Sequence, residues 1–560
     1  MSIPKQNTFF AQQMVSNLID LGVKYFAISP GSRSTPLTAA IAENPKAASF
    51  VFHDERAAAF FVLGIGKSGN LGAIITTSGT AIANAFPAVM EASNTHVPML
   101  LISADRPPEL RSSGANQTMD QVGLFGQNVR YFFDFPASDS FFTSKHLTST
   151  ISYGVSKCFG SSAGPVHFNC MFREPLEPID IKEVTFPKPH IYSHPKQDIS
   201  SAEKQQLTDI ISEAKNPFLV IGAIESISER YKAYFLTTKL DWPVLVDVSS
   251  GLSFLDYKNK IPFTELLIKE HQYLPKPDLI VQLGKGLTTK HYENWVRTLD
   301  CKHIIIDYRD SRYDPGHSCT WRIQASFNSI DFFCDIAPPD LSWLRKLQKQ
   351  AQNISISMEN ISEVSIAHYL PSWLPLGSQL FIGNSMPIRD LNNFALSARG
   401  LFSTSNRGVS GIDGIISSAA GWAIGNQKHC FLLIGDISFM HDIGVLFSIQ
   451  ALPISLTIIL INNSGGGIFS FLPISQIPKQ KETFEKYFAT SHSFKLAKVA
   501  RAIGITTKTI TSMEDLKFQV QNPSQGISLL EIFTDREKNI ADHQNIKTLI
   551  TKELRSLGRS

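Results

Sequence analysis

The chain reads Cys430-Phe431-Leu432-Leu433-Ile434-Gly435-Asp436-Ile437 and, further on, Leu456-Thr457-Ile458-Ile459-Leu460-Ile461-Asn462-Asn463-Ser464-Gly465-Gly466-Gly467-Ile468-Phe469. In both stretches a short apolar run, typical of a buried strand, precedes a polar or glycine-rich turn. The carboxyl ends of neighbouring parallel strands meet at one edge of an α/β sheet, where such proteins bind ligands. We therefore expect the two turns to form one site.

The chemistry of these turns is that of a metal and diphosphate site. The Asp436 carboxylate, the Asn463 amide oxygen and the Gly465 carbonyl are hard oxygen donors, which suit Mg²⁺ or Mn²⁺. The glycines let the backbone approach a diphosphate closely. Either turn alone is more simply explained as an ordinary turn. Together, in this order and at this spacing, they resemble the cofactor motif of thiamine diphosphate enzymes.

The rest of the chain divides into blocks in which apolar runs alternate with helical patterns, as βαβ units do. At 560 residues the chain is long enough for several domains. Apolar runs lie at residues 25–28, 72–75 and 99–102 in the first block, and at 218–222, 244–247, 279–284 and 304–307 in the second. Helical patterns of the first block lie at 57–67 and 82–93. The sequence predicts an α/β protein with three doubly wound parallel-sheet domains in series.

The domain boundaries are predicted from composition. A proline-rich passage cannot continue a helix or a central strand and therefore indicates a linker. The expected segments are a first domain over 1–182, a proline-rich linker over 183–205, a central Rossmann-like domain over 206–340, a polar helical linker over 341–360 and a metal-binding domain over 361–560. The central block has no glycine-rich phosphate loop, so its Rossmann-like pattern does not imply a bound nucleotide.

Composition and charge argue against several classes of function. The chain is 43% hydrophobic and 18% charged, as ordinary globular proteins are, and its net charge of +3 points to neither nucleic acid nor an anionic membrane as a partner. Six cysteines without CxxC spacing disfavour a disulfide framework or a zinc site. No apolar run approaches the ~18 residues of a membrane span, and residues 1–7 lack an apolar signal region. The sequence predicts a cytoplasmic protein without membrane insertion.

An acidic cluster, His53-Asp54-Glu55-Arg56, lies between the apolar run 48–52 and the alanine-rich apolar stretch 57–66. In the simplest interpretation, Asp54 and Glu55 are favourable charges at a helix N-terminus. Thiamine diphosphate enzymes also require a carboxyl group that hydrogen-bonds the aminopyrimidine ring and drives proton transfer. Glu55 resembles that activating glutamate in its position at a strand end of the first block. It is the candidate catalytic residue.

Further segments carry a closer resemblance. They are Ser29-Pro30-Gly31-Ser32-Arg33-Ser34-Thr35-Pro36-Leu37, Ser103-Ala104-Asp105-Arg106-Pro107-Pro108-Glu109-Leu110, Gly114-Ala115-Asn116-Gln117, Leu287-Thr288-Thr289-Lys290, Gly383-Asn384-Ser385-Met386-Pro387-Ile388-Arg389-Asp390 and Ser405-Asn406-Arg407-Gly408-Val409-Ser410-Gly411-Ile412-Asp413-Gly414. In this order they resemble the 2-succinyl-5-enolpyruvyl-6-hydroxy-3-cyclohexene-1-carboxylate synthase family of menaquinone biosynthesis. The resemblance implies the thiamine diphosphate fold, with a pyrimidine domain, a central domain and a diphosphate domain.

The resemblance implies a reaction and its substrates. The family decarboxylates 2-oxoglutarate and adds the resulting enamine to isochorismate in a conjugate addition, giving 2-succinyl-5-enolpyruvyl-6-hydroxy-3-cyclohexene-1-carboxylate and CO₂. Both substrates are dicarboxylates, whose burial requires charged donors, preferably arginine. By resemblance, Ser385, Arg389 and Arg407 would hold the succinyl part. Isochorismate would be held by Ser32, Arg33, Arg106, Gln117 and Lys290, with Asn116 as a further neutral donor.

The resemblance also implies the cofactor contacts. The expected cofactor-binding residues are Glu55, Ile412, Gly435, Asp436, Ile437, Asn463, Gly465, Gly466, Ile468 and Phe469. Among them, Asp436, Asn463 and the Gly465 carbonyl would hold the metal, and Ile412 would keep the cofactor bent. Ile468, Phe469 and Leu472 would form an apolar wall that keeps water away and so favours carbon–carbon bond formation.

Assembly follows from the separation of two residues. Glu55 and Asp436 lie in different blocks but must meet opposite ends of one cofactor. Superfamily resemblance therefore implies a homodimer or homotetramer, with each site built from two chains.

One residue departs from the family pattern, and two alternative functions stay open. His291 follows Lys290 where some family members carry a second basic residue, and a histidine is at best partly charged at neutral pH. The first alternative is another thiamine diphosphate decarboxylase or carboligase, which would not need the arginine set. The second is a non-catalytic subunit of the same fold, against which the intact Glu55, Asp436 and Asn463 argue.

Overall fold

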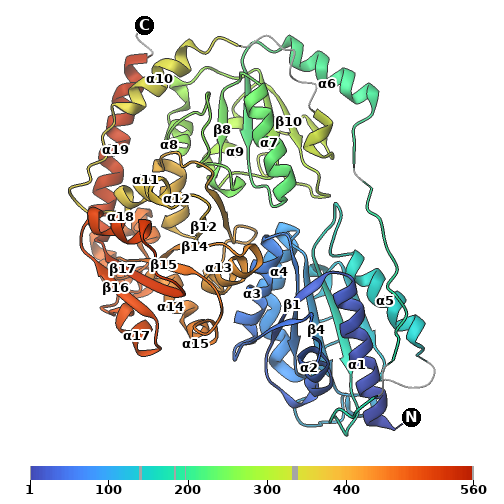
Figure 1. Ribbon diagram of the computed structural model, residues 1–560. Coiled ribbons are helices and arrows are strands. Elements are labelled where there is room, and N and C mark those ends of the chain that lie inside the picture. Colours follow the sequence, from blue (N-terminus) through green and yellow to red (C-terminus); the bar gives the residue numbers. More distant parts are fainter. Residues whose placement is uncertain (1, 138–141, 182–183, 196, 331–338, 558–560) are drawn as a thin grey trace. The chain divides into compact units, whose positions relative to one another are not determined.

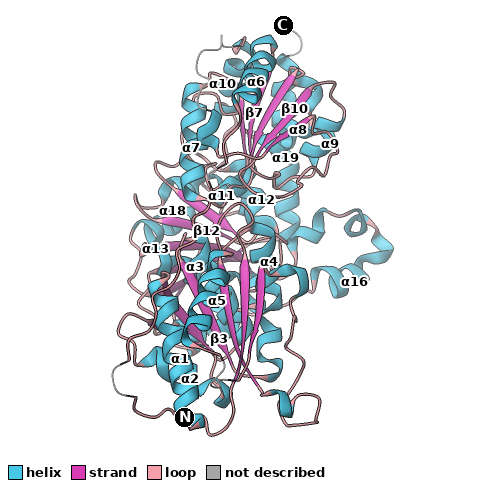
Figure 2. Ribbon diagram, turned by 90° about the vertical axis from the view of Figure 1, so that its right-hand side faces the viewer, coloured by secondary structure: helices cyan, strands magenta, loops and turns pink. Residues whose placement is uncertain are grey.

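The computed structural model describes residues 2–137, 142–181, 184–195, 197–330 and 339–557. These residues form three sheets of six, five and six strands, and the strands pair in parallel throughout. Helices cover the faces of each sheet (Figures 1 and 2). The predicted fold class is confirmed. The boundary expected at residues 182 and 183, and Cys334, lie outside the described residues.

The first sheet has the strand order β2-β1-β3-β4-β6-β5. Its strands are β1 (Val23–Ile28), β2 (Ala48–Val51), β3 (Leu71–Thr76), β4 (Met99–Asp105), β5 (Tyr131–Phe135) and β6 (Pro165–Met171). The helices of this part are α1 (Ile3–Asp20), α2 (Thr35–Ala42), α3 (Glu55–Lys67), α4 (Phe86–Thr95) and α5 (Ser144–Ser156). Strands β3, β4 and β6 are buried at every position, as expected for parallel strands covered on both faces.

The pattern at residues 82–93 predicted a single helix, and this prediction was partly wrong. Residues Gly79–Ala85 form a 3₁₀ helix, and α4 begins only at Phe86. Pro87 lies in the first turn of α4, where its missing N–H group would have no helical partner in any case. The proline therefore marks a helix start.

The middle sheet has the order β11-β10-β9-β7-β8. Its strands are β7 (Pro217–Ile221), β8 (Val244–Val246), β9 (Leu279–Leu283), β10 (Lys302–Ile306) and β11 (Trp321–Ile323). The helices of this part are α6 (Ser201–Glu213), α7 (Ile227–Lys239), α8 (Thr264–Lys269), α9 (His291–Arg297) and α10 (Ser342–Gln352). Helix α10 lies within the stretch expected as a linker, and its Leu344 and Leu347 are buried in a hydrophobic core.

The third sheet has the order β13-β12-β14-β15-β17-β16. Its strands are β12 (Gln379–Ile382), β13 (Phe402–Ser405), β14 (Cys430–Gly435), β15 (Leu456–Asn462), β16 (Thr506–Ile510) and β17 (Ile527–Phe533). The helices of the third block are α11 (Glu363–Trp373), α12 (Met386–Phe394), α13 (Ile415–Asn426), α14 (Asp436–His441), α15 (Leu446–Ile449), α16 (Lys481–Phe484), α17 (Leu496–Ala502), α18 (Met513–Gln521) and α19 (Arg536–Leu557).

The first and third sheets share one topology. When strands are numbered within each sheet, both orders read 2-1-3-4-6-5. The chain leaves β1 and β3 toward opposite edges of the first sheet, and it leaves β12 and β14 in the same way in the third. Such a reversal opens a crevice at the carboxyl ends of the strands, which is where α/β proteins bind ligands. Each of the two sheets therefore has one such reversal point.

By compactness the chain forms two units. The first comprises residues 1–195, 406–427 and 441–454, and the second comprises 196–405, 428–440 and 455–560. Within the first unit α13 packs along α3 (Figure 1). A Cβ atom on Gly64 or Gly421 would overlap the backbone of the facing helix, so the close approach requires both glycines. The expected boundaries of the three domains stay a prediction, because the units combine segments of different blocks.

None of the helices in the described ranges combines the length and the apolar character needed to cross a membrane.

Candidate active site

A cavity lies where β12, β14 and β15 end, at the reversal point of the third sheet. It is lined by Glu363, Ser385, Met386, Pro387, Gly435, Asp436, Ile437, Ser438, Ile461, Asn463, Gly465, Gly466 and Gly467. The two turns that opened the sequence analysis therefore meet in one place, together with the turn that follows β12. The structure brings together the expected metal ligands, three of the expected diphosphate contacts and Ser385.

Asp436 is buried at the start of α14 and accepts three hydrogen bonds. Its Oδ1 accepts from the Ile437 N–H at 2.7 Å, and its Oδ2 accepts from the Gly465 N–H at 2.9 Å. The third donor is His492, whose Nε2 lies 3.2 Å from Oδ2. Because the Phe494 N–H donates to Nδ1 of His492, Nε2 carries the ring proton. Burial raises the pKa of Asp436, while the two backbone donors favour its ionised form.

Asn463 follows β15, and its side chain is held on one side only. Its Nδ2 donates to Glu363 Oε1 at 2.9 Å. Its Oδ1 is buried and has no hydrogen-bond partner among the residues that the structure describes. A buried amide oxygen without a partner is unfavourable unless another group satisfies it. A divalent cation in the cavity would do so, and the donor set therefore fits Mg²⁺ or Mn²⁺.

Gly465 connects the two ligand-bearing turns. Its φ of +150° is open to glycine alone, and a Cβ atom there would lie 2.6 Å from the Ala489 carbonyl. Its carbonyl accepts from the Gly467 N–H at 2.9 Å and keeps a second lone pair. A side chain at this position would displace the turn that meets Asp436.

The acidic cluster of the first sheet divides its two carboxylates between two tasks. Asp54 is the N-cap of α3 and accepts from the backbone N–H groups of Arg56 and Ala57 at 2.8 and 3.4 Å. Glu55 is half-buried and accepts from the Asn84 side chain at 3.2 Å. Both carboxylates therefore lie at a helix N-terminus, as the simplest interpretation expected, but only Asp54 makes the capping hydrogen bonds.

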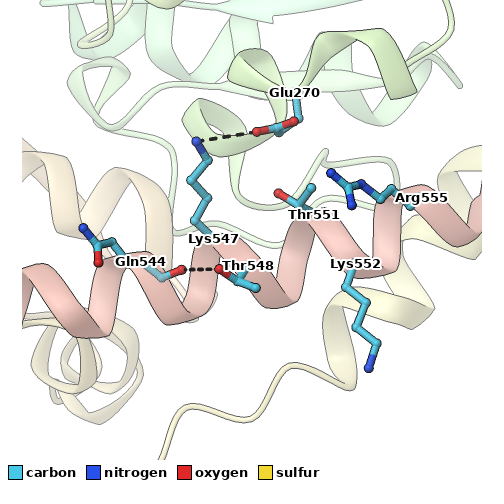
Figure 3. Close-up of a pocket in the computed structure, with 7 residues that line it drawn as sticks. All are labelled: Glu270, Gln544, Lys547, Thr548, Thr551, Lys552 and Arg555. Atoms are coloured by element: carbon cyan, nitrogen blue, oxygen red, sulfur yellow. Dashed lines mark hydrogen bonds and ion pairs between the residues drawn. The ribbon is translucent and has the colours of Figure 1, made fainter.

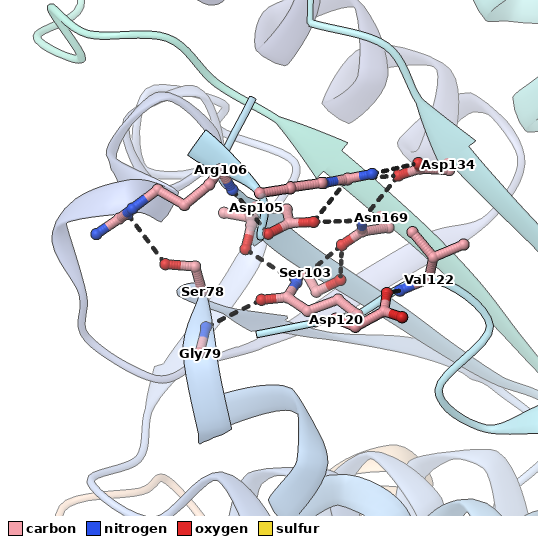
Figure 4. Close-up of polar contacts among 12 residues, drawn as sticks. Ser78, Gly79, Ser103, Asp105, Arg106, Asp120, Val122, Asp134 and Asn169 are labelled. Carbon is pink, nitrogen blue, oxygen red and sulfur yellow. Dashed lines mark hydrogen bonds and ion pairs between the residues drawn. The ribbon is translucent and has the colours of Figure 1, made fainter. Parts of the chain in front are cut away.

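Two of the expected isochorismate-binding arginines lie close together in the first unit. The Arg106 guanidinium donates to Ser78 Oγ at 3.1 Å (Figure 4). It also donates to the Asn116 carbonyl at 3.0 Å. Burial lowers the pKa of Arg106, and the positive charge of Arg33 lowers it further. Gln117 joins the same cluster, because its Nε2 donates to the Ser78 carbonyl at 3.1 Å. Three of the expected contacts, Arg106, Asn116 and Gln117, thus lie around the turn at Ser78. Ser32, next to Arg33 in the chain, is exposed.

Arg33 is more constrained than its sequence motif suggested. It is buried, and it donates to the Phe172 carbonyl at 2.9 Å and to Glu174 Oε1 at 2.6 Å. These contacts connect Arg33 to the segment after β6, which is a structural role. A contact between Arg33 and isochorismate stays a prediction.

A buried polar network adjoins Arg106 and the turn at Ser78 (Figure 4). Asp105 accepts from the Arg106 N–H at 2.7 Å and from Asn169 at 2.8 Å. Gln121 donates to Asn169 at 2.9 Å and accepts from the Gly79 N–H at 2.9 Å. Through Asp105 on β4 and Asn169 on β6, the network connects Arg106 and Gly79 to the first sheet.

Ser385 and Arg389 lie together after β12. Arg389 donates to the Ser385 carbonyl at 2.5 Å, and Ser385 has a φ of 72°, in the left-handed region. Such backbone strain is typical of functional sites. Arg407 and Ile412 belong to the first unit, whereas Ser385 and Arg389 belong to the second. In the first unit Glu91 holds the Arg407 segment by accepting from the Gly408 and Val409 N–H groups at 2.8 and 2.7 Å.

Ile468 and Phe469 lie in the 3₁₀ helix Gly467–Phe471, and Leu472 follows it. Ile468 is half-buried, while Phe469 and Leu472 are exposed. Their role as an apolar wall stays a prediction.

A second hollow, along α19, contains none of the expected site residues (Figure 3). It is lined by Glu270, Gln544, Lys547, Thr548, Thr551, Lys552 and Arg555. Lys547 lies 3.6 Å from Glu270, in an ion pair. The expected metal ligands lie instead at the strand ends of the third sheet.

Comparisons with known proteins agree with this geometry. The model described as "Thiamine pyrophosphate enzyme, N-terminal TPP binding domain" matches residues 9–124, "Middle domain of thiamine pyrophosphate" matches 187–382, and "Thiamine pyrophosphate enzyme, C-terminal TPP binding domain" matches 394–532. A 2-succinyl-5-enolpyruvyl-6-hydroxy-3-cyclohexene-1-carboxylate synthase of Prosthecochloris aestuarii is 35% identical, over 98% of both chains. The chain belongs to this synthase family. Synthases of Pelodictyon phaeoclathratiforme and Rubrobacter xylanophilus are 36% and 34% identical, over 96–98% of each chain. The expected family is thus confirmed, and the chain is a thiamine diphosphate enzyme with three domains in series.

The departure from the synthase pattern at His291 has a structural context. Lys290 is exposed ahead of α9, and His291 is the first residue of that helix. Burial lowers the pKa of His291, and the charges of Lys269 and Lys290 lower it further. These effects favour the neutral form of the His291 ring, which carries no permanent charge.

Sequence reasoning missed three polar residues that hold expected synthase-site groups. Glu363, His492 and Glu91 contact Asn463, Asp436 and the Arg407 segment respectively. Glu363 follows Ser362 in what reads as an ordinary helix start, and no motif surrounds the other two. Only the folded arrangement identifies them.

Proposed function

We propose that this chain decarboxylates 2-oxoglutarate and joins the remaining four-carbon fragment to isochorismate, giving 2-succinyl-5-enolpyruvyl-6-hydroxy-3-cyclohexene-1-carboxylate and CO₂ in menaquinone biosynthesis. One observation carries this proposal: relatives that bear the synthase name match the chain over nearly its whole length. The cavity after β12, β14 and β15 supports it, because it holds the oxygen donors that such an enzyme needs. The free cysteines among the described residues suit the reducing cytoplasm in which we place the enzyme.

In this proposal Asp436, Asn463 and the Gly465 carbonyl hold Mg²⁺ or Mn²⁺ against the cofactor diphosphate, which Gly435, Ile437 and Gly466 border. Thiamine diphosphate, when bound, supplies the carbanion chemistry that releases CO₂ from a 2-oxo acid and joins the rest to an acceptor. Glu55 would provide the carboxyl group that exchanges a proton with the bound cofactor. Ile412 would pack against the cofactor, and Ile468, Phe469 and Leu472 would exclude water from the site.

The basic residues divide between two dicarboxylates. Ser385, Arg389 and Arg407 are proposed to hold the carboxylates of 2-oxoglutarate. The proposed isochorismate contacts are Ser32, Arg33, Arg106, Asn116, Gln117 and Lys290. The proximity of Arg33 and Arg106 supports this division, because two neighbouring guanidinium groups attract anions, although Glu174 already pairs with Arg33.

This division predicts a split in kinetic behaviour. Lys290→Ala should raise the KM for isochorismate, and Arg389→Ala should raise the KM for 2-oxoglutarate. Each variant loses one charge-assisted contact, typically about 1.5–3 kcal/mol, or roughly 10–150-fold. Steady-state kinetics with each substrate varied in turn measures this. Arg33→Ala is a poorer choice, because it also loses the contacts with Phe172 and Glu174. The proposed division is wrong if both variants affect both substrates equally.

The proposed assembly is a homodimer, or a homotetramer made of two such dimers, with each site built from the first block of one chain and the third block of its partner. Glu55 and Asp436 support this, because they belong to different units and must meet opposite ends of one cofactor. Inactive Glu55→Gln and Asp436→Ala chains can therefore complement each other. A mixed dimer carries both defects in one site and leaves the other intact.

Random pairing makes about half of the dimers mixed, so roughly a quarter of all sites should recover activity on co-expression. Activity of a purified, doubly tagged mixed dimer measures this directly. A mixed dimer without activity would mean that each site is built within one chain.

A further inference from the structure

Glu363 is a buried residue beside the proposed metal site, and its carboxylate accepts hydrogen bonds from three side chains. It is the first residue of α11, its side chain lines the cavity, and it is 2% exposed. Its Oε1 accepts from Asn463 Nδ2 at 2.9 Å and from Thr534 Oγ1 at 3.0 Å. Its Oε2 accepts from Asn539 Nδ2 at 3.1 Å. One carboxylate thus connects the end of β15, the turn after β17 and the helix α19.

The contact with Glu363 determines which way the Asn463 amide faces. An amide nitrogen only donates and an amide oxygen only accepts, so a carboxylate that already receives two other donors takes the nitrogen of Asn463. The oxygen must then point away from Glu363. It is this oxygen, Oδ1, that is buried without a hydrogen-bond partner among the described residues. Glu363 therefore presents the one atom of Asn463 that suits a cation.

We propose that Glu363 is a positioning residue for the divalent cation, and that it acts by fixing the Asn463 amide with its oxygen toward the metal. This inference rests on the proposed role of Asn463 as a metal ligand. Groups that orient a metal ligand typically change metal affinity about 10–100-fold when they are removed. Glu363 itself does not need to contact the metal, the cofactor or a substrate.

The first test is Glu363→Gln, which keeps the side-chain shape and replaces one acceptor oxygen by a donor. The affinity for Mg²⁺ should weaken about 10–100-fold. The measurement is a calorimetric Mg²⁺ titration of the full-length protein with saturating thiamine diphosphate. Thermal unfolding without Mg²⁺ and cofactor reports whether the variant is folded.

A reciprocal exchange gives a sharper test. Asn463→Asp alone places two carboxylates face to face. In the double variant Asn463→Asp/Glu363→Gln, the introduced amide nitrogen can donate to the introduced carboxylate, and the amide oxygen can still accept from Asn539. We expect the double variant to bind Mg²⁺ more tightly than either single variant. A merely structural role of Glu363 would instead make the two substitutions additive or worse.

The chain offers a matched control one residue away. Asn462 donates to another buried carboxylate, Glu531, at 2.8 Å, and Glu531 also accepts from the Leu496 N–H at 2.9 Å. Glu531→Gln removes a buried carboxylate from the neighbouring asparagine. It should lower thermal stability and leave Mg²⁺ affinity unchanged.

The outcomes separate this inference from the proposed function. If Glu363→Gln and Glu531→Gln weaken Mg²⁺ binding equally, or if the double variant binds no better than the single ones, Glu363 is not a positioning residue, although the metal assignment stands. If Asn463→Ala binds Mg²⁺ as the native protein does, the metal assignment itself is wrong.

Discussion

Glu55→Gln should slow hydrogen exchange at C2 of bound thiamine diphosphate by about two to four orders of magnitude, with a modest loss of cofactor affinity. Glutamine keeps the shape of the side chain and its place at the start of α3, but it cannot take up and release the proton. Overall turnover should fall with the exchange rate. Quenched-flow exchange in deuterated buffer, read by NMR, measures the rate on the full-length protein.

Asp54 provides the matched control, because it is the adjacent carboxylate and performs the capping role. Asp54→Ala should lose the hydrogen bonds to the Arg56 and Ala57 N–H groups and destabilise the fold by about 1 kcal/mol. Its exchange rate should stay close to that of the native protein. Fast exchange in Glu55→Gln together with slow exchange in Asp54→Ala would show that the two carboxylates have been assigned the wrong way round.

Asp436→Ala should abolish activity and thiamine diphosphate binding together. Among the three proposed metal ligands, Asp436 is the charged one. Its removal should therefore weaken cofactor binding by more than the factor of about 10–100 that is typical when a group that only orients a metal ligand is lost. Excess Mg²⁺ should restore little. Calorimetric titration with cofactor at several Mg²⁺ concentrations measures both effects.

Asp442→Asn is a suitable control for the loss of a buried carboxylate. Asp442 is buried and accepts from the Ser417 N–H at 2.9 Å, near the start of α13. Its substitution should change thermal stability and leave the Mg²⁺ dependence of cofactor binding intact. Near-native cofactor affinity in Asp436→Ala would contradict the metal assignment.

Much of the fold was predictable because parallel strands buried on both faces read as short, continuous apolar runs. The runs at residues 430–434 and 456–461 became β14 and β15, and the turns after them meet in one cavity. The prediction was partly wrong at 82–93, where the α-helix begins only at Phe86, with Pro87 in its first turn. The common strand order of the first and third sheets has no counterpart in a visible sequence repeat, because topology constrains burial rather than residue identity.

The groups around the site were less predictable than the site itself. Asp436 and Asn463 belong to motifs, but their partners His492 and Glu363 are distant in the sequence and come close only through packing. Arg33 shows the opposite case. Its motif indicates a substrate contact, and the structure adds contacts with Phe172 and Glu174 that no local pattern indicates. Motifs thus indicate the chemistry, while packing determines what each charge can reach.

The most direct test of the proposed reaction supplies the full-length enzyme, thiamine diphosphate and Mg²⁺ with 2-oxoglutarate, first alone and then with isochorismate. CO₂ release and product mass are followed together. We expect isochorismate to accelerate CO₂ release, with one CO₂ formed per product molecule, whose mass equals the sum of both substrates less CO₂. CO₂ release that isochorismate leaves unchanged, with only the four-carbon aldehyde as product, would contradict the proposed reaction and identify a simple 2-oxo acid decarboxylase.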